Sequence, residues 1–410
     1  MKKLFAGLFS KFVDSGVPEG ASKGLEYALS EDKTYYIVTG MGSCKDKDVV
    51  LYGVYKNLPV KEIGEYAFSD CREMTSIKLP DEIVKIGKSA FSYCTALTSI
   101  RIPDGVKEMG KYAFSNCEYL ESVEIGNGLK KIEEGVFSDC GIKALKIGAG
   151  VKEIEFEAFA TCMDLESIVI PENVTVVGNC AFRECVVLTD VQLPETPIKI
   201  GRGVFSDCKN LALTEYGNCK YLRNKDNPYF ALMEVVSPTL GEYTIHEDTK
   251  MISAAAFEEC KSLTSVVIPD GVISIGESAF SECTELTNIT FGKGVKVIGE
   301  SAFYGCKHLT EVDIPDNVVT IEKKAFSHCW NLQTARIGKG VTSIGQEAFA
   351  GCLYLQTVEI ANKDASVGDY AFYGCEKLKN KGTDNGVSQS KAADCSGNSL
   401  RAERMRRSGQ

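Results

Sequence analysis

The chain has 410 residues, of which 44% are hydrophobic, 25% charged and 9% aromatic. This composition excludes a disordered polymer, and no stretch reaches the roughly 18 uninterrupted apolar residues that a membrane-spanning helix needs. Because 46 basic residues stand against 56 acidic ones, the net charge of −10 repels phosphate backbones and anionic lipid, and nucleic acid is not an expected partner.

Residues 1–22 form the first segment of the chain. Lys2 and Lys3 precede an apolar run, Leu4 to Phe9, that is shorter than the roughly 7–15 residues of a signal peptide core. By sequence the protein is therefore expected in the cytoplasm. The same segment has the pattern of a short amphipathic helix, with one apolar face made of Leu4, Leu8, Phe9 and Phe12.

Residues 23–57 predict a β cap. Two alternating apolar runs, Tyr35 to Val38 and Val49 to Tyr52, flank a turn region rich in Gly, Lys and Asp. A cap of this kind closes the end of a repeat array and keeps its apolar interior away from water.

From residue 58 to residue 378 one pattern recurs. Thirteen Phe residues each have a Cys three positions later, and they follow one another at 23 residues, apart from one interval of 22 and one of 52. A fixed period in this range predicts a solenoid whose coils bury their apolar faces against one another, here about 13 or 14 coils. The thirteen residues are Phe68, Phe91, Phe114, Phe137, Phe159, Phe182, Phe205, Phe257, Phe280, Phe303, Phe326, Phe349 and Phe372.

Each repeat predicts a short strand, a second apolar position and a tight turn. Leu97, Ile100 and Ile102 show the Leu-x-x-Ile-x-Ile spacing of a strand with alternate side chains pointing inward, and Pro103 ends it. Five residues before every Phe an aliphatic residue forms a second inward column, a candidate second strand. The next position is Gly in nine repeats, such as Gly87, where a positive φ is convenient but not obligatory. The Ala or Val before each Phe predicts a crowded helical turn.

The repeat resembles the BspA-like, or Treponema-type, leucine-rich repeats of bacteria, with the consensus Leu-x-x-Ile-x-Ile-Pro…Val-x-x-Ile-Gly-x-x-Ala-Phe-x-x-Cys, over Leu58 to Leu378. The resemblance implies an α/β leucine-rich repeat fold, a curved right-handed solenoid with parallel short strands and short helical turns. Many members are exported surface proteins that bind host proteins or other cells. It therefore also implies a binding or cell-adhesion role, with the cell surface or secretion as the alternative location.

Thirteen of the seventeen cysteines occupy one repeat position. Neighbouring coils bring their Cα atoms to about 5 Å, but parallel side chains disfavour the torsion of about 90° that a disulfide requires. We therefore expect reduced, buried thiols whose small volume fills a corner of each coil. No repeat pairs its Cys with another ligand at metal-binding spacing and only three histidines are present, so no metal or cofactor is expected.

The 52-residue interval contains an insertion at about residues 212–240. Two apolar runs there flank Asn224 to Pro228, which predicts a hairpin. Two interpretations stay open: the segment projects an aromatic binding site, or it is an irregular coil that packs its aromatic rings inward. The candidate binding residues are Tyr216, Tyr221, Tyr229 and Phe230.

Residues 379–410 lack apolar periodicity and are rich in Ser, Gly, Asp and Lys, so we expect a disordered basic tail. No catalytic or phosphate-binding motif interrupts the repeats.

The outward positions of the first strand form a mixed polar face, on which Arg101 and Arg336 are further candidate binding residues. These features predict a non-enzymatic protein that presents a stiff curved surface and an aromatic insertion to a protein partner, without a small-molecule ligand. The alternative is an architectural scaffold that has no dedicated recognition site. The outward positions are Lys78, Arg101, Glu124, Lys146, Val169, Gln192, Val267, Thr290, Asp313, Arg336 and Glu359.

Overall fold

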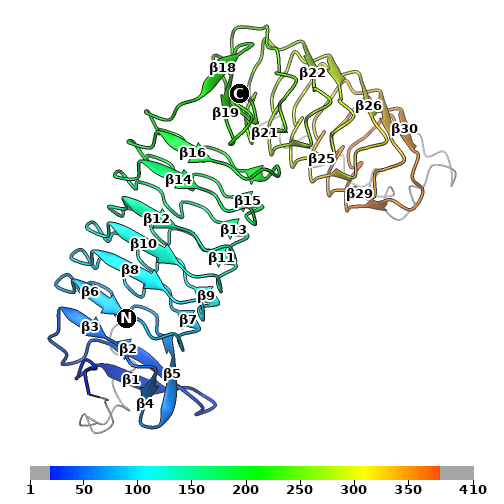
Figure 1. Cartoon of the computed structure of the whole chain (residues 1–410). Coiled ribbons are helices and arrows are strands. Elements are labelled where there is room, and N and C mark those ends of the chain that lie inside the picture. The colour runs from blue at the N-terminus through cyan, green and yellow to red at the C-terminus, as the bar shows by residue number, and fades with distance from the viewer. Residues whose placement is uncertain (1–18, 379–410) are drawn as a thin grey trace, which may run out of the picture. The chain divides into compact units, whose positions relative to one another are not determined.

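The computed structural model describes residues 19–378, which form short strands, turns and connecting segments (Figure 1). Most of segment 1–22 and the tail from residue 379 lie outside the described residues. The predictions of an amphipathic helix in the first and of disorder in the second therefore concern residues that the structure does not describe. Within the described range no helix is long and apolar enough to cross a bilayer. The chain divides into two compact units. Unit 1 comprises residues up to 194 together with 203–211, and unit 2 comprises 195–202 and the residues from 212 onward.

Most coils begin with a strand of three or four residues, and most of these strands pair in parallel with the equivalent strand of a neighbouring coil. Ile100 pairs with Val123, for example, and Val312 pairs with Ala335. Inward side chains alternate with outward ones, as predicted from the Ile-x-Ile pattern. In unit 1 these strands are β6 (Ser76–Lys78), β8 (Ser99–Ile102), β10 (Ser122–Ile125), β12 (Ala144–Lys146), β14 (Ser167–Val169) and β16 (Asp190–Gln192). In unit 2 they are β22 (Ser265–Val267), β24 (Asn288–Thr290), β26 (Glu311–Ile314), β28 (Thr334–Ile337) and β30 (Thr357–Ile360).

The second aliphatic column forms a second, two-residue strand in each coil, which confirms that candidate element. Ile86 pairs with Met109 in unit 1, and Ile275 pairs with Ile298 in unit 2. In unit 1 these strands are β7 (Lys85–Ile86), β9 (Glu108–Met109), β11 (Lys131–Ile132), β13 (Glu153–Ile154) and β15 (Val176–Val177). Unit 2 contains β17 (Lys199–Ile200), β21 (Met251–Ile252), β23 (Ser274–Ile275), β25 (Val297–Ile298), β27 (Thr320–Ile321), β29 (Ser343–Ile344) and β31 (Ser366–Val367).

Antiparallel strands begin unit 1. β1 (Glu26–Leu29) pairs antiparallel with β2 (Tyr36–Gly40), and β2 then lies parallel to β5 (Leu58–Ile63), where the array of second strands starts. β4 (Val54–Tyr55) folds back on β5, and β3 (Asp48–Val50) extends the row of first strands by pairing with β6.

A similar arrangement begins unit 2. β18 (Thr214–Tyr216), β19 (Cys219–Leu222) and β20 (Ala231–Val235) form an antiparallel meander. β20 then pairs parallel with β21, so the inserted segment supplies the first three strands of a nine-stranded sheet. Both units therefore start with antiparallel strands and continue as parallel ladders.

The prediction of short helical turns is wrong, because no helix occurs anywhere in residues 19–378. The reason lies in the amide groups around each Phe. The N–H groups of Tyr66, Phe68 and Asp70 donate to carbonyls of the next coil, at 2.7–3.0 Å. They are consequently not available for the i→i−4 bonds of a helix, and the intervening amides close β-turns by i→i−3 bonds, such as Ser69 to Tyr66 at 3.1 Å.

The glycine column has a different cause from the one expected. Gly87 does not have a positive φ; instead, a Cβ there would lie 2.5 Å from the backbone nitrogen of Glu65 in the preceding coil. Close approach of two backbones, not a left-handed conformation, favours Gly at this position. Positive φ angles occur two residues before and two residues after the repeat Phe, as at Tyr112 (59°) and Asn116 (60°).

The core of each unit is a column of phenylalanine rings. Ring planes of neighbouring coils lie within 16° of parallel, with centroids 4.7–5.7 Å apart. Because ring atoms in contact are about 3.5–4.0 Å apart, these separations correspond to offset stacking. The coil spacing thus imposes on the rings one of the arrangements that aromatic pairs favour.

The cysteine column lies beside the rings and is tied to them. Each thiol that has a coil before it donates to the carbonyl oxygen of the Phe in that coil, as Cys94 does to Phe68 at 3.1 Å and Cys306 does to Phe280 at 3.3 Å. Burial raises the pKa of the Cys162 thiol to about 12. The thiol of each repeat Cys thus has two roles: it fills a small space inside the coil, and as a weak hydrogen-bond donor it links that coil to the preceding one.

Candidate functional site

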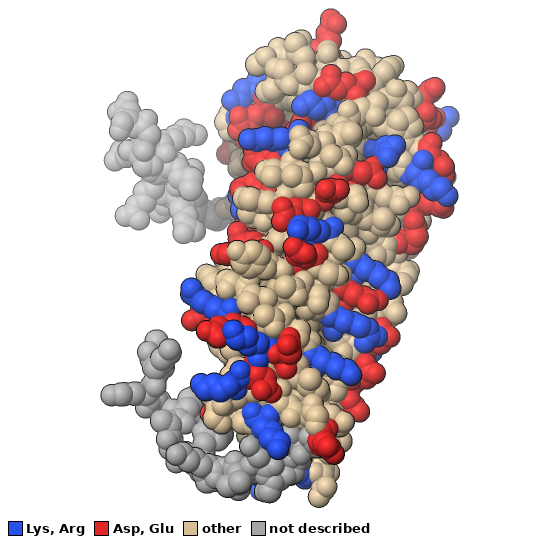
Figure 2. Space-filling model, turned by 60° about the vertical axis from the view of Figure 1, so that its left-hand side comes forward, with Lys and Arg blue, Asp and Glu red and all other residues tan. Residues whose placement is uncertain are grey.

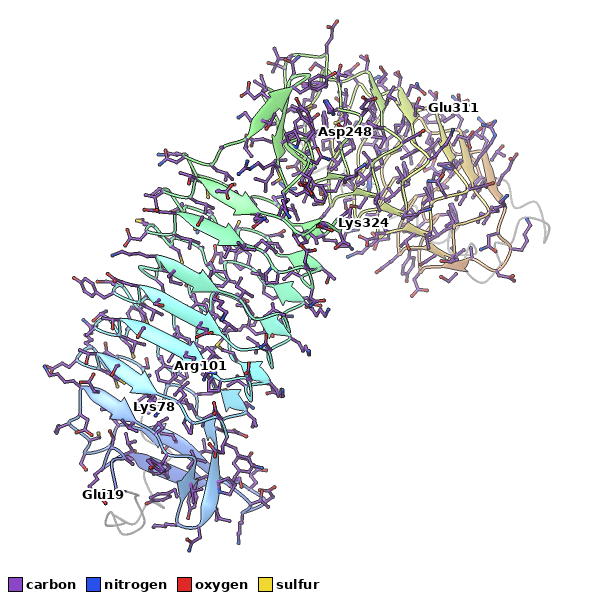
Figure 3. All side chains as sticks on the ribbon, viewed as in Figure 1. Glu19, Lys78, Arg101, Asp248, Glu311 and Lys324 are labelled. Atoms are coloured by element: carbon purple, nitrogen blue, oxygen red, sulfur yellow. The ribbon has the colours of Figure 1, made fainter. Side chains whose placement is uncertain are left out.

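The strand face of unit 1 consists of the outward side chains of the first strands. Arg101 on β8 lies between two acids: its Nη1 is 3.6 Å from Asp81 Oδ1, and its Nε is 3.9 Å from Glu124 Oε2. Lys78 occupies the neighbouring strand β6 (Figure 3). Lys146 on the other side lies 2.7 Å from Glu124, and it lowers the pKa of the Glu124 carboxyl chiefly through this hydrogen bond.

Loose ion pairs leave the Arg101 guanidinium able to bind a partner. Its side chain is 58% exposed and neither carboxylate is within ordinary hydrogen-bond distance. A partner carboxylate can replace either acid at little cost, because exposed pairs of this geometry contribute almost nothing to stability.

The strand face of unit 2 has the same arrangement around Arg336. Its Nη1 is 4.0 Å from Glu311 Oε2 and its Nε is 4.0 Å from Glu359 Oε2. Here, however, the surface is hollowed. A depression of about 840 Å³ lies over strands β24, β26, β28 and β30, and Arg336, Asp313, Glu359 and Phe291 contribute to its lining.

Phe291 is the residue of this site that sequence reasoning missed. It occupies the position after β24 at which other coils have the second Ile of the Ile-x-Ile run, such as Ile268 and Ile314, and its ring packs edge to face on the core residue Phe303, with centroids 5.8 Å apart. The ring is half-buried and gives the depression an apolar floor under charged walls. The available signal was the Phe that stands where other coils have the second Ile of the run.

Exposed valines add apolar contact area to both strand faces. Val169 on β14 is 60% exposed, and Val267 on β22 is 65% exposed. Acidic and basic side chains are interspersed over the face of the molecule shown in Figure 2, so no field of a single sign marks the surface there.

Two of the four aromatic candidates of the inserted segment cannot form a surface site. Tyr221 is completely buried and Phe230 is 2% exposed, because the meander turns them into the core of unit 2. The N–H of His246 donates to the Tyr221 hydroxyl at 3.1 Å. For these two residues the interpretation as a projecting binding site is wrong, and inward packing is the arrangement observed.

The other two aromatic candidates lie at the edge of the same cluster. Tyr229 is partly buried and stacks on the His246 ring, with centroids 3.6 Å apart, and Tyr216 meets that ring edge to face at 4.7 Å. Tyr216 is 43% exposed and is the one candidate of the four that offers substantial area to a partner.

The described residues contain no group of three or more His, Cys, Asp and Glu side chains placed to hold a metal ion. The repeat thiols lie inside the coils, whereas His308 bonds outward to the backbone carbonyl of Thr284 at 2.7 Å.

Comparison with known proteins identifies the repeat. The family described as "BspA type Leucine rich repeat region (6 copies)" matches residues 56–165, 152–226 and 250–379. No catalytic family is among these matches, and no curated protein matches the chain.

Two solved structures with similar repeats come from bacteria. A leucine rich cell surface protein from Faecalibacterium prausnitzii A2-165 is 27% identical, over 84% of this chain and 94% of that one, with a TM-score of 0.36. A leucine-rich repeat protein from Bacteroides ovatus is 26% identical, over 88% of this chain and 94% of that one, with a TM-score of 0.39. Since the family match spans most of the sequence, this chain belongs to the BspA type leucine-rich repeat family.

Proposed function

We propose that the protein is a non-enzymatic binding module that recognises another protein through its strand faces. The observation that supports this most directly is the depression of unit 2, where a half-buried ring lies beneath Asp313, Arg336 and Glu359. An apolar floor with polar groups of both signs at its walls suits a protein surface, whose contact patches combine buried apolar groups with charged rims.

The charges define the partner more closely. Arg336 is held loosely by two acids, so a partner carboxylate can approach it, while Asp313 and Glu359 accept from a partner Lys or Arg. The partner therefore presents charges of both signs around an apolar side chain that enters the depression. Such complementarity selects the partner and its orientation more than it adds affinity.

Affinity is expected to be spread over several coils. The strand face of unit 1 repeats the acid–arginine–acid arrangement at Arg101, and Val169 and Val267 add exposed apolar area. Tyr216 is an additional contact of this proposal, whereas the buried Tyr221 and Phe230 are not.

The test is affinity capture with the intact chain from the surroundings of its native source, quantified by mass spectrometry. The variant Val267→Asp/Arg336→Glu changes the strand face of unit 2. Its control, Lys261→Glu, makes the same change of charge sign at a residue that is 65% exposed and lies outside the strand face. We expect the double variant to lose most of the captured partner and the control to retain it.

Equal recovery by the wild type, the double variant and the control would show that the strand face is not the recognition surface. If neither the wild type nor the variants enrich any protein, the architectural alternative is favoured.

A further inference from the structure

A groove crosses the coils of unit 1 on a surface that the strand-face proposal does not use. It lies along the ridge, defined here as the residues from two positions before to two positions after each repeat Phe. The groove has a volume of about 490 Å³ and extends from the coil of Phe68 to the coil of Phe182.

Three rows of side chains build this groove. The residues directly after the Phe form the floor, and all are small from Ser69 through Ser92, Ser115 and Ser138 to Ala160. The residues two before and two after the Phe form the walls. Both wall rows have positive φ angles, such as 61° at Tyr93 and 59° at Tyr112, and the small floor residues lie between them.

Large side chains delimit the groove. Arg183 is the first large residue of the floor row, and its guanidinium is held by Glu157 at 3.2 Å and Glu184 at 2.6 Å. In unit 2 the floor row contains Glu258, Tyr304 and Tyr373, so no continuous row of small residues exists there.

The groove contains polar groups that have no partner within the described chain. Ser89 is only 8% exposed, yet its hydroxyl makes no hydrogen bond with any of residues 19–378, and it lines the groove. The side chains of Asn116, Asp139 and Thr161, which also line it, likewise make no hydrogen bond to the part of the chain that the structure describes. These polar groups line the groove and are not paired within the described chain, so they are available to hydrogen-bond a ligand that lies in it.

Aromatic rings lie among these polar groups. Tyr66 is 54% exposed and Tyr93 is 48% exposed, on opposite walls of the groove. A tyrosine ring offers an apolar face, and the amide of Asn116 and the carboxylate of Asp139 each offer two hydrogen-bonding atoms in one plane.

We propose that this groove binds a neutral, linear, β-linked glycan chain. A pyranose ring has C–H groups on its faces, which pack on tyrosine, and hydroxyl groups around its rim, which pair with planar amides and carboxylates. The groove repeats its floor and wall positions once per coil, about every 4.8 Å, and an extended β-linked glycan advances by nearly one sugar over that interval.

The charges favour a neutral chain over an acidic one. Arg183 is already paired with two carboxylates, and Asp139 leaves the groove slightly negative, which repels uronic acids and sulfated sugars. An extended peptide advances by about 3.3 Å per residue, so its side chains do not keep step with the coils.

The experiment measures binding of three neutral β-1,4-linked hexasaccharides, cellohexaose, mannohexaose and xylohexaose, to the full chain by isothermal titration calorimetry. The blocking variant is Ser115→Tyr, which places in the floor the residue that unit 2 carries at the equivalent position, Tyr304. Its matched control is Ser281→Tyr, the same substitution at the same coil position in unit 2. Tyr93→Ala removes an exposed wall ring and serves if Ser115→Tyr fails to fold.

We expect at least one hexasaccharide to bind the wild type and the Ser281→Tyr control alike. Ser115→Tyr and Tyr93→Ala are each expected to weaken that binding tenfold or more, with an unchanged melting temperature. The proposal fails if none of the three sugars binds at millimolar concentration, or if the groove variants bind as well as the control does. If the groove variants instead remove a captured protein while no sugar binds, the groove is a protein site, and that outcome also refutes it. The sugar-binding results do not bear on the strand-face proposal.

Discussion

The two units contain the same interior and different surfaces. In both, a ring column, a thiol column and two strand rows repeat coil by coil, and the ring spacing is 4.8–5.7 Å in unit 1 and 4.7–5.5 Å in unit 2. Their ridges differ. In unit 1 the residues directly after each Phe are small and leave a groove, whereas in unit 2 Glu258 and Tyr304 interrupt the equivalent row. The strand faces differ too, since Phe291 lies in a hollow of unit 2.

This difference separates the residues that specify the coil from those available for recognition. Inward positions meet an equivalent neighbour in the next coil, so a change in one coil disturbs two interfaces. Outward side chains meet mainly solvent and a few adjacent charges, so they vary without disturbing the stack. Specific binding is therefore to be sought at outward positions where the two units differ.

The largest expected effect tests the equality of the two interiors. Phe114→Ala in unit 1 and Phe280→Ala in unit 2 each remove a fully buried ring stacked on both sides, so each should lower the free energy of unfolding by about 3–5 kcal/mol. Urea denaturation measures this loss. Phe205, which is partly exposed and stacks on Phe182, is the milder reference, and its replacement by Ala should cost less. A loss under 1 kcal/mol for Phe280→Ala would contradict the stacked column.

A somewhat smaller effect tests whether the inserted segment is a cap. Tyr221→Ala empties a fully buried site in the core of unit 2 and should cost about 2–4 kcal/mol. Tyr216→Ala, at a ring that is 43% exposed, should leave the urea midpoint nearly unchanged. Equal, small losses for both variants would mean that the segment contributes surface and not core.

Alkaline pH should destabilise both units through their thiol columns. Burial raises the pKa of Cys162 to about 12 and that of Cys260 to about 11, whereas an unfolded thiol ionises near 8.5. Above that lower value the unfolded chain has released protons that the folded chain retains, so stability is complete below about pH 8.5 and falls as pH rises toward 11–12. Melting temperatures measured between pH 8 and pH 11 follow this loss.

The thiols also allow a direct control for the alkaline effect. Cys162→Ala removes one ionisable group and should make the fall in melting temperature with pH shallower, even though the variant starts less stable. A slope identical to that of the wild type would assign the alkaline loss to other groups.

The smallest effects are expected at the strand faces. Arg101→Ala and Arg336→Ala each break two loose, exposed ion pairs, so differential scanning calorimetry should find almost unchanged stability. Either single substitution should weaken partner binding only slightly, since the contacts are spread over several coils. A large loss of binding from Arg101→Ala alone would locate the recognition site in unit 1.

The sequence by itself determined the period, the inward columns and the family. Phe and Cys three residues apart, recurring every 23 residues, leave one economical way to bury the rings, and the Ile-x-Ile runs fix which side chains point inward. These features are predictable because each depends on residues within one repeat and on its copy in the next.

Tertiary structure decided the features that depend on contacts between coils. The tight turn is not helical because amides such as that of Phe68 donate to the next coil, and Gly87 is small because another backbone passes close to it. Tyr221 is buried because β18, β19 and β20 begin a sheet, and the groove at Ser89 exists because small residues of several coils fall into one row. Local pattern cannot reveal these outcomes, since each depends on the approach of chain segments that lie a full repeat or more apart.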